Sequence, residues 1–142
     1  MGDDGSSTWD LVTGTASLVY DNQLFIIGDI GSSRLNDAWC SPDWSTWSLV
    51  TGTAAWSGRS DHTSVVYNNQ MFAMGGNGGS LKCINVWSLS DGATWAWASS
   101  TAGWCGRSGH TSVVYDNQMF DVSPKLNTTI STNSMSYEAP II

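Results

Sequence analysis

Short apolar runs alternate with turn residues over the first 120 positions, and the runs have the length of β-strands. Four runs are predicted as strands, at residues 62–67, 70–74, 84–89 and 94–98. In the third run, alternation puts Trp87 and Leu89 on one face. Asn68-Asn69 and Asp91-Gly92 are typical of tight hairpin turns, since Asn tolerates a positive φ. Helical periodicity is absent, so we predict an all-β fold of four-stranded antiparallel sheets.

This pattern returns every 47 or 48 residues. The stretch from Tyr67 to Phe72 recurs from Tyr115 to Phe120, and an earlier copy runs from Tyr20 to Phe25. Three tryptophan pairs are 48 residues apart: Trp39 and Trp87, Trp47 and Trp95, and Trp56 and Trp104. Such a period is typical of repeat proteins, in which each unit buries its apolar face against its neighbours. We therefore predict copies near residues 9–50, 51–99 and 100–120, with all six paired tryptophans in the core.

The two ends of the chain depart from the repeat. Residues 1–8 are predicted to be disordered, and residues 121–142 form a polar tail that holds none of the 15 Gly and none of the 9 Trp. Within the first copy, no counterpart exists for the stretch from Ala55 to His62. The repeated part of the chain is therefore framed by segments of different composition.

Two features of the repeat resemble the kelch family. One is the doublet Gly75-Gly76 followed by the spaced aromatics Trp87 and Trp95, and the other is Gly106-Arg107-Ser108-Gly109-His110, with a looser copy at residues 59–62. This resemblance implies that each copy is one blade of a β-propeller. A closed propeller needs at least about four blades, so the expected kelch-like propeller is incomplete, and one chain does not close the ring.

Charge and composition exclude several classes of partner. The formal net charge is −7, with only five Lys and Arg, which disfavours nucleic acid and anionic membranes. No apolar run reaches the roughly 18 residues of a membrane span, and residues 1–7 lack the features of a signal peptide. The cytoplasm is then the default compartment. The three Cys show no Cys-x-x-Cys spacing, so neither a zinc site nor any other metal or cofactor is predicted.

Five residues are candidates for ligand binding: Trp44, Arg59, Asp61, Asn77 and Arg107. Trp44 falls in a turn and is expected to be exposed, and Asn77 opens a loop that differs between the copies. Arg59 and Arg107 recur with His62 and His110, either as a charged rim for an acidic ligand or as residues that bond neighbouring blades together. The second interpretation is favoured, because what recurs in every repeat is usually architectural.

No catalytic constellation emerges from these residues. Asp61 precedes His62, but neighbours along a strand point to opposite faces. We therefore predict a protein that is not an enzyme and acts as a protein-interaction module or as a fragment of a kelch-like propeller. Its partner would be another protein or further copies of the chain. The alternatives are a carbohydrate- or small-ligand-binding module with exposed aromatics, and a fragment of a larger propeller enzyme.

Overall fold

The computed structural model describes residues 15–90, 94–100, 102–124 and 135–137. These residues form antiparallel strands joined by turns, without a helix among them. The strands are β1 (Ala16–Tyr20), β2 (Gln23–Ile30), β3 (Arg34–Ser41), β4 (Ser48–Thr51), β5 (Thr63–Tyr67), β6 (Gln70–Met74), β7 (Val86–Leu89), β8 (Trp95–Ser99), β9 (Thr111–Tyr115), β10 (Gln118–Pro124) and β11 (Met135–Tyr137). The fold is all-β, as the alternating pattern predicts.

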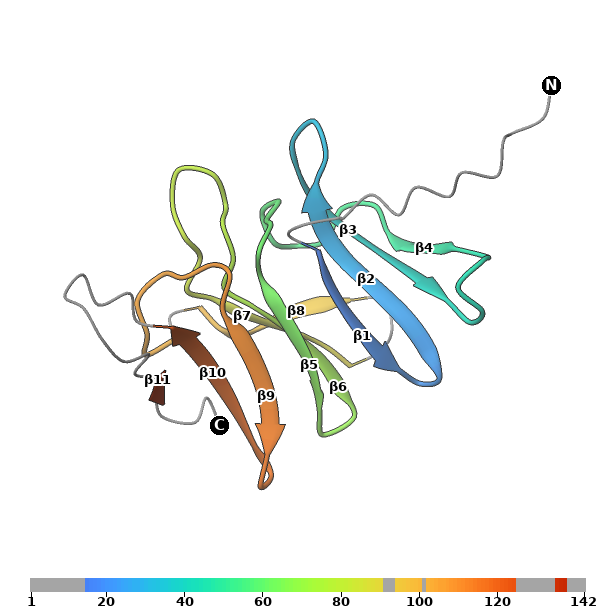
Figure 1. Ribbon diagram of the computed structural model, residues 1–142. Helices are drawn as coiled ribbons and strands as arrows, with labels where there is room; N and C mark the ends of the chain where they lie inside the picture. The colour runs from blue at the N-terminus through green and yellow to red at the C-terminus, as the bar shows by residue number, and fades with distance from the viewer. Residues whose placement is uncertain (1–14, 91–93, 101, 125–134, 138–142) are drawn as a thin grey trace.

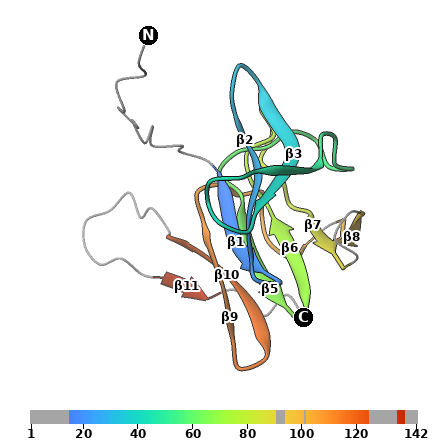
Figure 2. The same ribbon diagram turned by 90° about the vertical axis from the view of Figure 1, so that its right-hand side faces the viewer.

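The strands make three separate sheets, and none of the sheets is closed. The first sheet has the order β1-β2-β3-β4, the middle sheet β5-β6-β7-β8 and the third sheet β11-β10-β9. Figures 1 and 2 show the sheets side by side, with β5 lying between β1 and β9. The middle sheet therefore has a neighbour on each face, whereas the first and third sheets each have one neighbour among the described residues.

In each sheet, a two-residue turn joins the first two strands along the chain, and both residues of the turn have a positive φ. Asn68 and Asn69 have φ values of 49° and 56°, and the pairs Asp21-Asn22 and Asp116-Asn117 adopt the same conformation. These turns set the register Tyr67↔Gln70, which recurs in the other two sheets. The predicted hairpins are confirmed. The Asp91-Gly92 turn lies outside the described residues.

Two apolar cores hold the three sheets together. The first core joins Phe25 and Ile27 of β2 to the face of the middle sheet that carries Met71, Trp87 and Trp95. A second core joins the opposite face of the middle sheet to the third sheet, through the side chains Val65, Phe72, Met74, Val86 and Met119. Alternation along β6 sends Met71 and Ala73 to one core, and Phe72 and Met74 to the other.

One tryptophan from each connection between sheets completes each core. Trp56 lies between β4 and β5 and packs edge-to-face on Trp95, with ring centroids 4.4 Å apart. Trp104, its copy 48 residues later, lies in the second core. Aromatic pairs in this geometry add about 0.5–1.5 kcal/mol beyond their area burial. The tryptophan repeat thus reflects repeated packing between sheets.

The prediction that all six paired tryptophans are core residues is wrong for Trp39. Trp87 is only 6% exposed, but Trp39, at the same repeat position, is 38% exposed. Both tryptophans have the same register, with Trp39 opposite Ile26 and Trp87 opposite Ala73, but the face that carries Trp39 turns away from the middle sheet and has no covering sheet among the described residues. Trp47 is half-buried, and the other four are buried.

The polar tail contributes strands where the structure describes it. Strand β10 continues to Pro124, and β11 pairs with it through Val122↔Tyr137. The tail sequence lacks a tryptophan or glycine pattern, so a third strand at this position had no signal in the sequence. The predicted disorder of residues 1–8 lies outside the described part of the chain.

Candidate functional site

The glycine doublet and the histidines of the repeat meet between neighbouring sheets. A Cβ on Gly75 would lie 2.7 Å from Cε1 of His110, and one on Gly76 would lie 2.7 Å from Cβ of His62. Gly28 of the first sheet faces His62 in the same way that Gly75 faces His110, with 3.2 Å from its notional Cβ to Cε1. Glycine is needed here because the backbone approaches the next sheet too closely for a side chain.

Arg59 is wholly buried and bound to the middle sheet. Its Nη1 donates to the carbonyl oxygen of Gly75 and to Oδ1 of Asn85, each at 2.9 Å, and its backbone N–H donates to Leu35 of the first sheet. With an exposed fraction of 0%, the guanidinium is not accessible to a ligand from solvent. Burial lowers the pKa of Arg59. This geometry matches the architectural interpretation of the recurring arginine.

Arg107 has a carboxylate partner that Arg59 lacks. Asp121, 1% exposed on β10, places its Oδ1 3.8 Å from Nη1 of Arg107 and its Oδ2 3.7 Å from Nε2 of His110. Nε of Arg107 also donates to the carbonyl of Cys105, and the guanidinium stacks over Trp104 at 5.5 Å. Asp121 occupies the position of Ala73 in the repeat, so the sequence did not single it out.

Both histidines are held neutral by burial. Burial lowers the pKa of His62 to about 3, and the charges of Arg59 and His110 act in the same direction. Burial likewise lowers the pKa of His110 to about 4, together with the charge of Arg107. A buried imidazole loses hydration when protonated, so the neutral form is favoured. Neither group is tuned to titrate near neutral pH as an acid or base.

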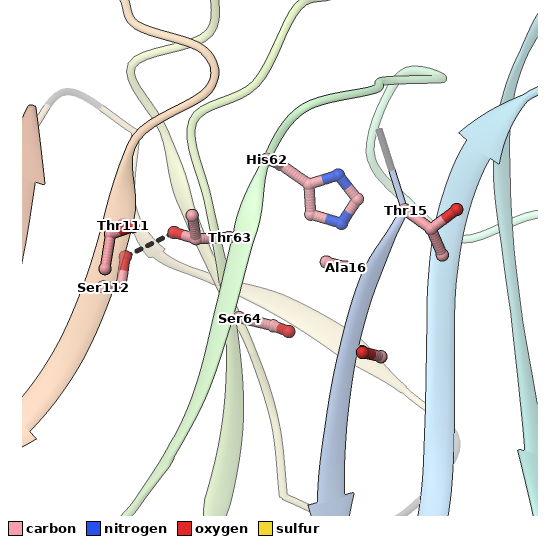
Figure 3. A pocket seen from close by; sticks show the side chains of 8 residues that line it. Thr15, Ala16, His62, Thr63, Ser64, Thr111 and Ser112 are labelled. Atoms are coloured by element: carbon pink, nitrogen blue, oxygen red, sulfur yellow. Dashed lines mark hydrogen bonds between the residues drawn. The ribbon is translucent and has the colours of Figure 1, made fainter. Parts of the chain in front are cut away.

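A cavity of about 280 Å³ lies between β1, β5 and β9 (Figure 3). These three strands, each the first of its sheet along the chain, are called the inner strands. The lining of the cavity is mostly hydroxyl-bearing, with repeat-related side chains from the three sheets, namely Thr15, Ser17, Thr63, Ser64, Thr111 and Ser112, together with Ala16 and His62. Thr63 and Ser112 hydrogen-bond across it. Neither ring nitrogen of His62 makes a hydrogen bond, so no hydroxyl there is activated by the imidazole.

Trp44 is presented by a rigid turn between β3 and β4. The carboxylate of Asp43 accepts hydrogen bonds from the backbone N–H groups of Ser45 and Thr46, at 2.9 and 2.7 Å, and these bonds lower the pKa of Asp43 to about 2. The hydroxyl of Ser41 accepts the N–H of Trp44 at 2.8 Å. Trp44 itself has a φ of +67° and is 67% exposed, as the sequence predicts.

The five candidate residues do not converge on one site. Asn77 pairs its backbone with Ser60, and its side chain accepts the N–H of Gly79 at 3.0 Å. Asp61 is exposed at a positive φ of 54°, and its carbonyl accepts the N–H of Gly109. Trp44 lies in the turn between β3 and β4, near the edge of the first sheet that is opposite to β1 and the cavity. The structure brings together the residues between sheets, not the predicted ligand contacts.

The first and third sheets each expose an apolar face on the side away from the middle sheet, in line with the expectation that one chain does not close a ring. The leading face is the side of the first sheet that turns away from the middle sheet, and its exposed residues are Val19, Trp39 and Leu49. On the third sheet, the trailing face turns away from the middle sheet and exposes Val113 and Tyr115. An incomplete ring predicts uncovered faces on the terminal sheets, but the exposure of Trp39 on one of them was not predicted.

No protein-family model matches the chain, and no curated protein matches it. Among solved structures it is similar to the one titled "Structure of YjhT", with a TM-score of 0.63 and 15% sequence identity. The match covers 78% of this chain and 34% of that one, so the chain spans about a third of the length of that protein. At this identity, the likeness shows the fold alone.

The described residues also bear on metal binding and membrane spanning. Across the described residues, no three His, Cys, Asp or Glu side chains gather into a metal-binding group. No helix long and apolar enough to cross a membrane occurs in the same part of the chain.

Proposed function

We propose that this chain is a non-catalytic protein-interaction module built from kelch-like propeller blades, and that it binds protein partners through its leading and trailing faces. One observation carries the proposal. On each face, one exposed residue is the repeat copy of a residue that is buried between sheets inside the chain: Val113 of the trailing face copies Val65, and Trp39 of the leading face copies Trp87. Apolar faces of this kind mark interaction surfaces.

The kelch-like assignment is supported by what its marker residues contact. Gly75 of the doublet receives His110 of the next sheet, and Gly76 N–H donates to the carbonyl of Arg107 at 2.9 Å. Gly106 lies against the carbonyl of Lys82, where a Cβ would be 2.5 Å away. These residues therefore serve the contact between consecutive blades, which is the role expected of blade-defining positions in a repeat protein.

A non-catalytic role fits the chemistry of the buried polar groups. His62 and His110 have pKa values far below neutrality, and Arg59 donates hydrogen bonds to Gly75 and Asn85. General acid–base catalysis favours a group whose pKa lies near the working pH. The recurring polar residues act as links between sheets instead.

Site-specific photo-crosslinking tests the interaction function. A photoreactive amino acid placed at Val19 or at Val113 should attach covalently to another polypeptide in the native cell or its extract. The same amino acid at Leu81, which is exposed in the β6–β7 loop and belongs to neither face, is the matched control. Cross-links at the two faces but not at Leu81 support the proposal, and equal labelling at all three positions would contradict it.

A second candidate function is carbohydrate or small-ligand binding at Trp44. The observation in its favour is a bulky aromatic that is held exposed by four hydrogen bonds around Asp43 and Ser41. A strained positive φ at a non-glycine residue is a feature of functional turns. Glycan-array binding that is lost in Trp44→Ala but kept in Trp97→Ala, another exposed tryptophan, would favour this function over protein interaction.

A further inference from the structure

One tyrosine hydrogen bond occurs twice between consecutive sheets, at equivalent positions of the repeat. Tyr20 of the first sheet donates its hydroxyl proton to the carbonyl of Asn69 in the middle sheet, at 3.0 Å. Tyr67 of the middle sheet donates in the same way to the carbonyl of Asn117 in the third sheet, at 2.9 Å. Each sheet thus presents a tyrosine to the hairpin turn of the sheet that follows it.

The two ends of the chain carry the unused halves of this contact. Tyr115 is the third tyrosine of the series and is 72% exposed. Asn22 is the first turn asparagine of the series, equivalent to Asn69 and Asn117, and it is exposed in the turn of the first sheet. The apolar residues follow the same logic, because the trailing face repeats the side of the middle sheet that packs on the third sheet.

We infer that a second copy of this chain docks its leading face on the trailing face of the first, so that Tyr115 of each chain donates to the carbonyl of Asn22 of the other. Three sheets from each of two chains then form one six-sheet ring. Propellers are built from about four to eight blades, so this ring falls in the permitted range. Head-to-tail contacts of this kind close into a ring when the rotation between units allows it.

We call the contact between the leading face of one copy and the trailing face of the other the seam. Sequence differences at the two ends of the chain fit this contact. Between the middle and third sheets, Gly75 leaves room for His110. In the repeat, Ser123 is the copy of Gly75. Thr15 directly precedes β1, whereas a histidine directly precedes β5 and β9. In the sequence, a residue larger than glycine at one end is thus accompanied by a residue smaller than histidine at the other.

The backbone hydrogen bond of the internal contacts is altered in a matching way. Gly76 donates its N–H to the carbonyl of Arg107. Pro124, the residue equivalent to Gly76 in the third sheet, has no N–H to donate. The first copy lacks the stretch that carries the corresponding arginine ahead of β1. The inferred contact therefore forms without an equivalent of the Gly76 hydrogen bond, because residue 124 supplies no donor.

This inference rests on the proposed interaction function, and it names the partner as a second copy. The first measurement is the solution mass by light scattering after size-exclusion chromatography, at several protein concentrations. We expect a species of twice the 15.2 kDa chain mass. A mass of one chain throughout, or growth beyond two chains, would overturn the inference.

Two charge variants test the orientation of the seam. Val19→Lys alters only the leading face and Val113→Glu only the trailing face, and both side chains are exposed within the single chain. Each variant alone is expected to remain a single folded chain. An equimolar mixture is expected to recover the two-chain mass, since one seam then joins two unaltered faces and the other joins opposite charges.

The control variant is Leu81→Glu, which changes an exposed apolar residue outside both faces and should leave the two-chain mass unchanged. Circular dichroism and a thermal unfolding transition verify that each variant is folded. Pairs that persist in Val113→Glu alone would overturn the inference.

If the chain stays single while photo-crosslinks at Val19 and Val113 attach to other polypeptides, the second copy is excluded and the interaction function stands. Absence of any cross-link would remove both.

Discussion

Strands β5 and β9 have the same five residues, Thr-Ser-Val-Val-Tyr, but different surroundings. In β5, Val65 is 8% exposed because the third sheet covers it, whereas its copy Val113 in β9 is 46% exposed. Identical sequence therefore produces a core strand in the middle sheet and a half-exposed strand at the end. In this chain the burial of a residue depends on whether its sheet has a neighbour, not on the residue alone.

The largest effect should come from the paired tryptophans of this comparison. Trp87→Ala is expected to lower the free energy of unfolding by about 3–5 kcal/mol, as for other large-to-small changes in a core. Trp39→Ala should cost only about 1–2 kcal/mol, because its face has no covering sheet. Urea unfolding of both variants in the Val19→Lys background, which removes contacts between copies, provides the measurement. Equal losses would show that repeat position outweighs context.

A glycine pair separates close packing from backbone strain. Gly75 and Gly109 have nearly the same φ, 62° and 66°, but a Cβ meets His110 at the first and nothing within 4 Å at the second. Gly109→Ala should cost about 1 kcal/mol from the positive φ alone. Gly75→Ala should cost about 3 kcal/mol, since overpacking adds about 1–3 kcal/mol. Denaturant midpoints of the two variants measure the difference, and similar values would refute the close contact between sheets.

Acid should weaken the contacts between sheets through the histidines. The unfolded chain binds protons at His62 below a pKa of 6.5, whereas the folded chain resists protonation down to about 3. Stability therefore falls as the pH drops from 6.5 toward 3, by about 2 kcal/mol at pH 5 for this residue. Burial of His110 acts with the same sign between 6.5 and about 4.

Unfolding curves at pH 7 and pH 5 measure this loss. The variant His62→Gln should be less stable at pH 7 but lose about 2 kcal/mol less between the two pH values. A stability that does not change over this range would mean that the imidazoles are not buried between the sheets.

The smallest effect concerns the tyrosine hydroxyls. Tyr67→Phe removes a hydrogen bond to the carbonyl of Asn117 and should cost about 0.5–1.5 kcal/mol. Tyr115→Phe should leave the stability of the single chain unchanged, because its hydroxyl reaches no following sheet in the same chain. Thermal unfolding in the Val19→Lys background compares the two. A loss in Tyr115→Phe as large as in Tyr67→Phe would argue against the repeated tyrosine hydrogen bond.

Much of the fold was predictable from local sequence. The alternation of apolar residues predicted the strands of the middle sheet, and the Asn68-Asn69 pair predicted its first hairpin, because both signals act between residues close in the chain. These features do not depend on which sheets surround them.

The remaining features depend on contacts between sheets, and the sequence held no direct signal for them. Trp39 looks like a core residue by its repeat partner, yet its face is uncovered. Asp121 looks like part of a polar tail, yet it lies buried beside Arg107 and His110. Arg59 was named as a candidate ligand contact, although its recurrence favoured an architectural role; its particular partners, Gly75 and Asn85, had no signal in the sequence.

Hydrogen exchange in β5 and β9 tests whether the protection of a strand depends on the sheets that neighbour its own. In the Val19→Lys background, the amides of β5 and β9 have the same intrinsic exchange rates within the shared Thr-Ser-Val-Val-Tyr sequence. We expect slower exchange in β5, because neighbouring sheets cover both faces of the middle sheet but only one face of the third sheet. Equal protection of the two strands, or slower exchange in β9, would contradict it.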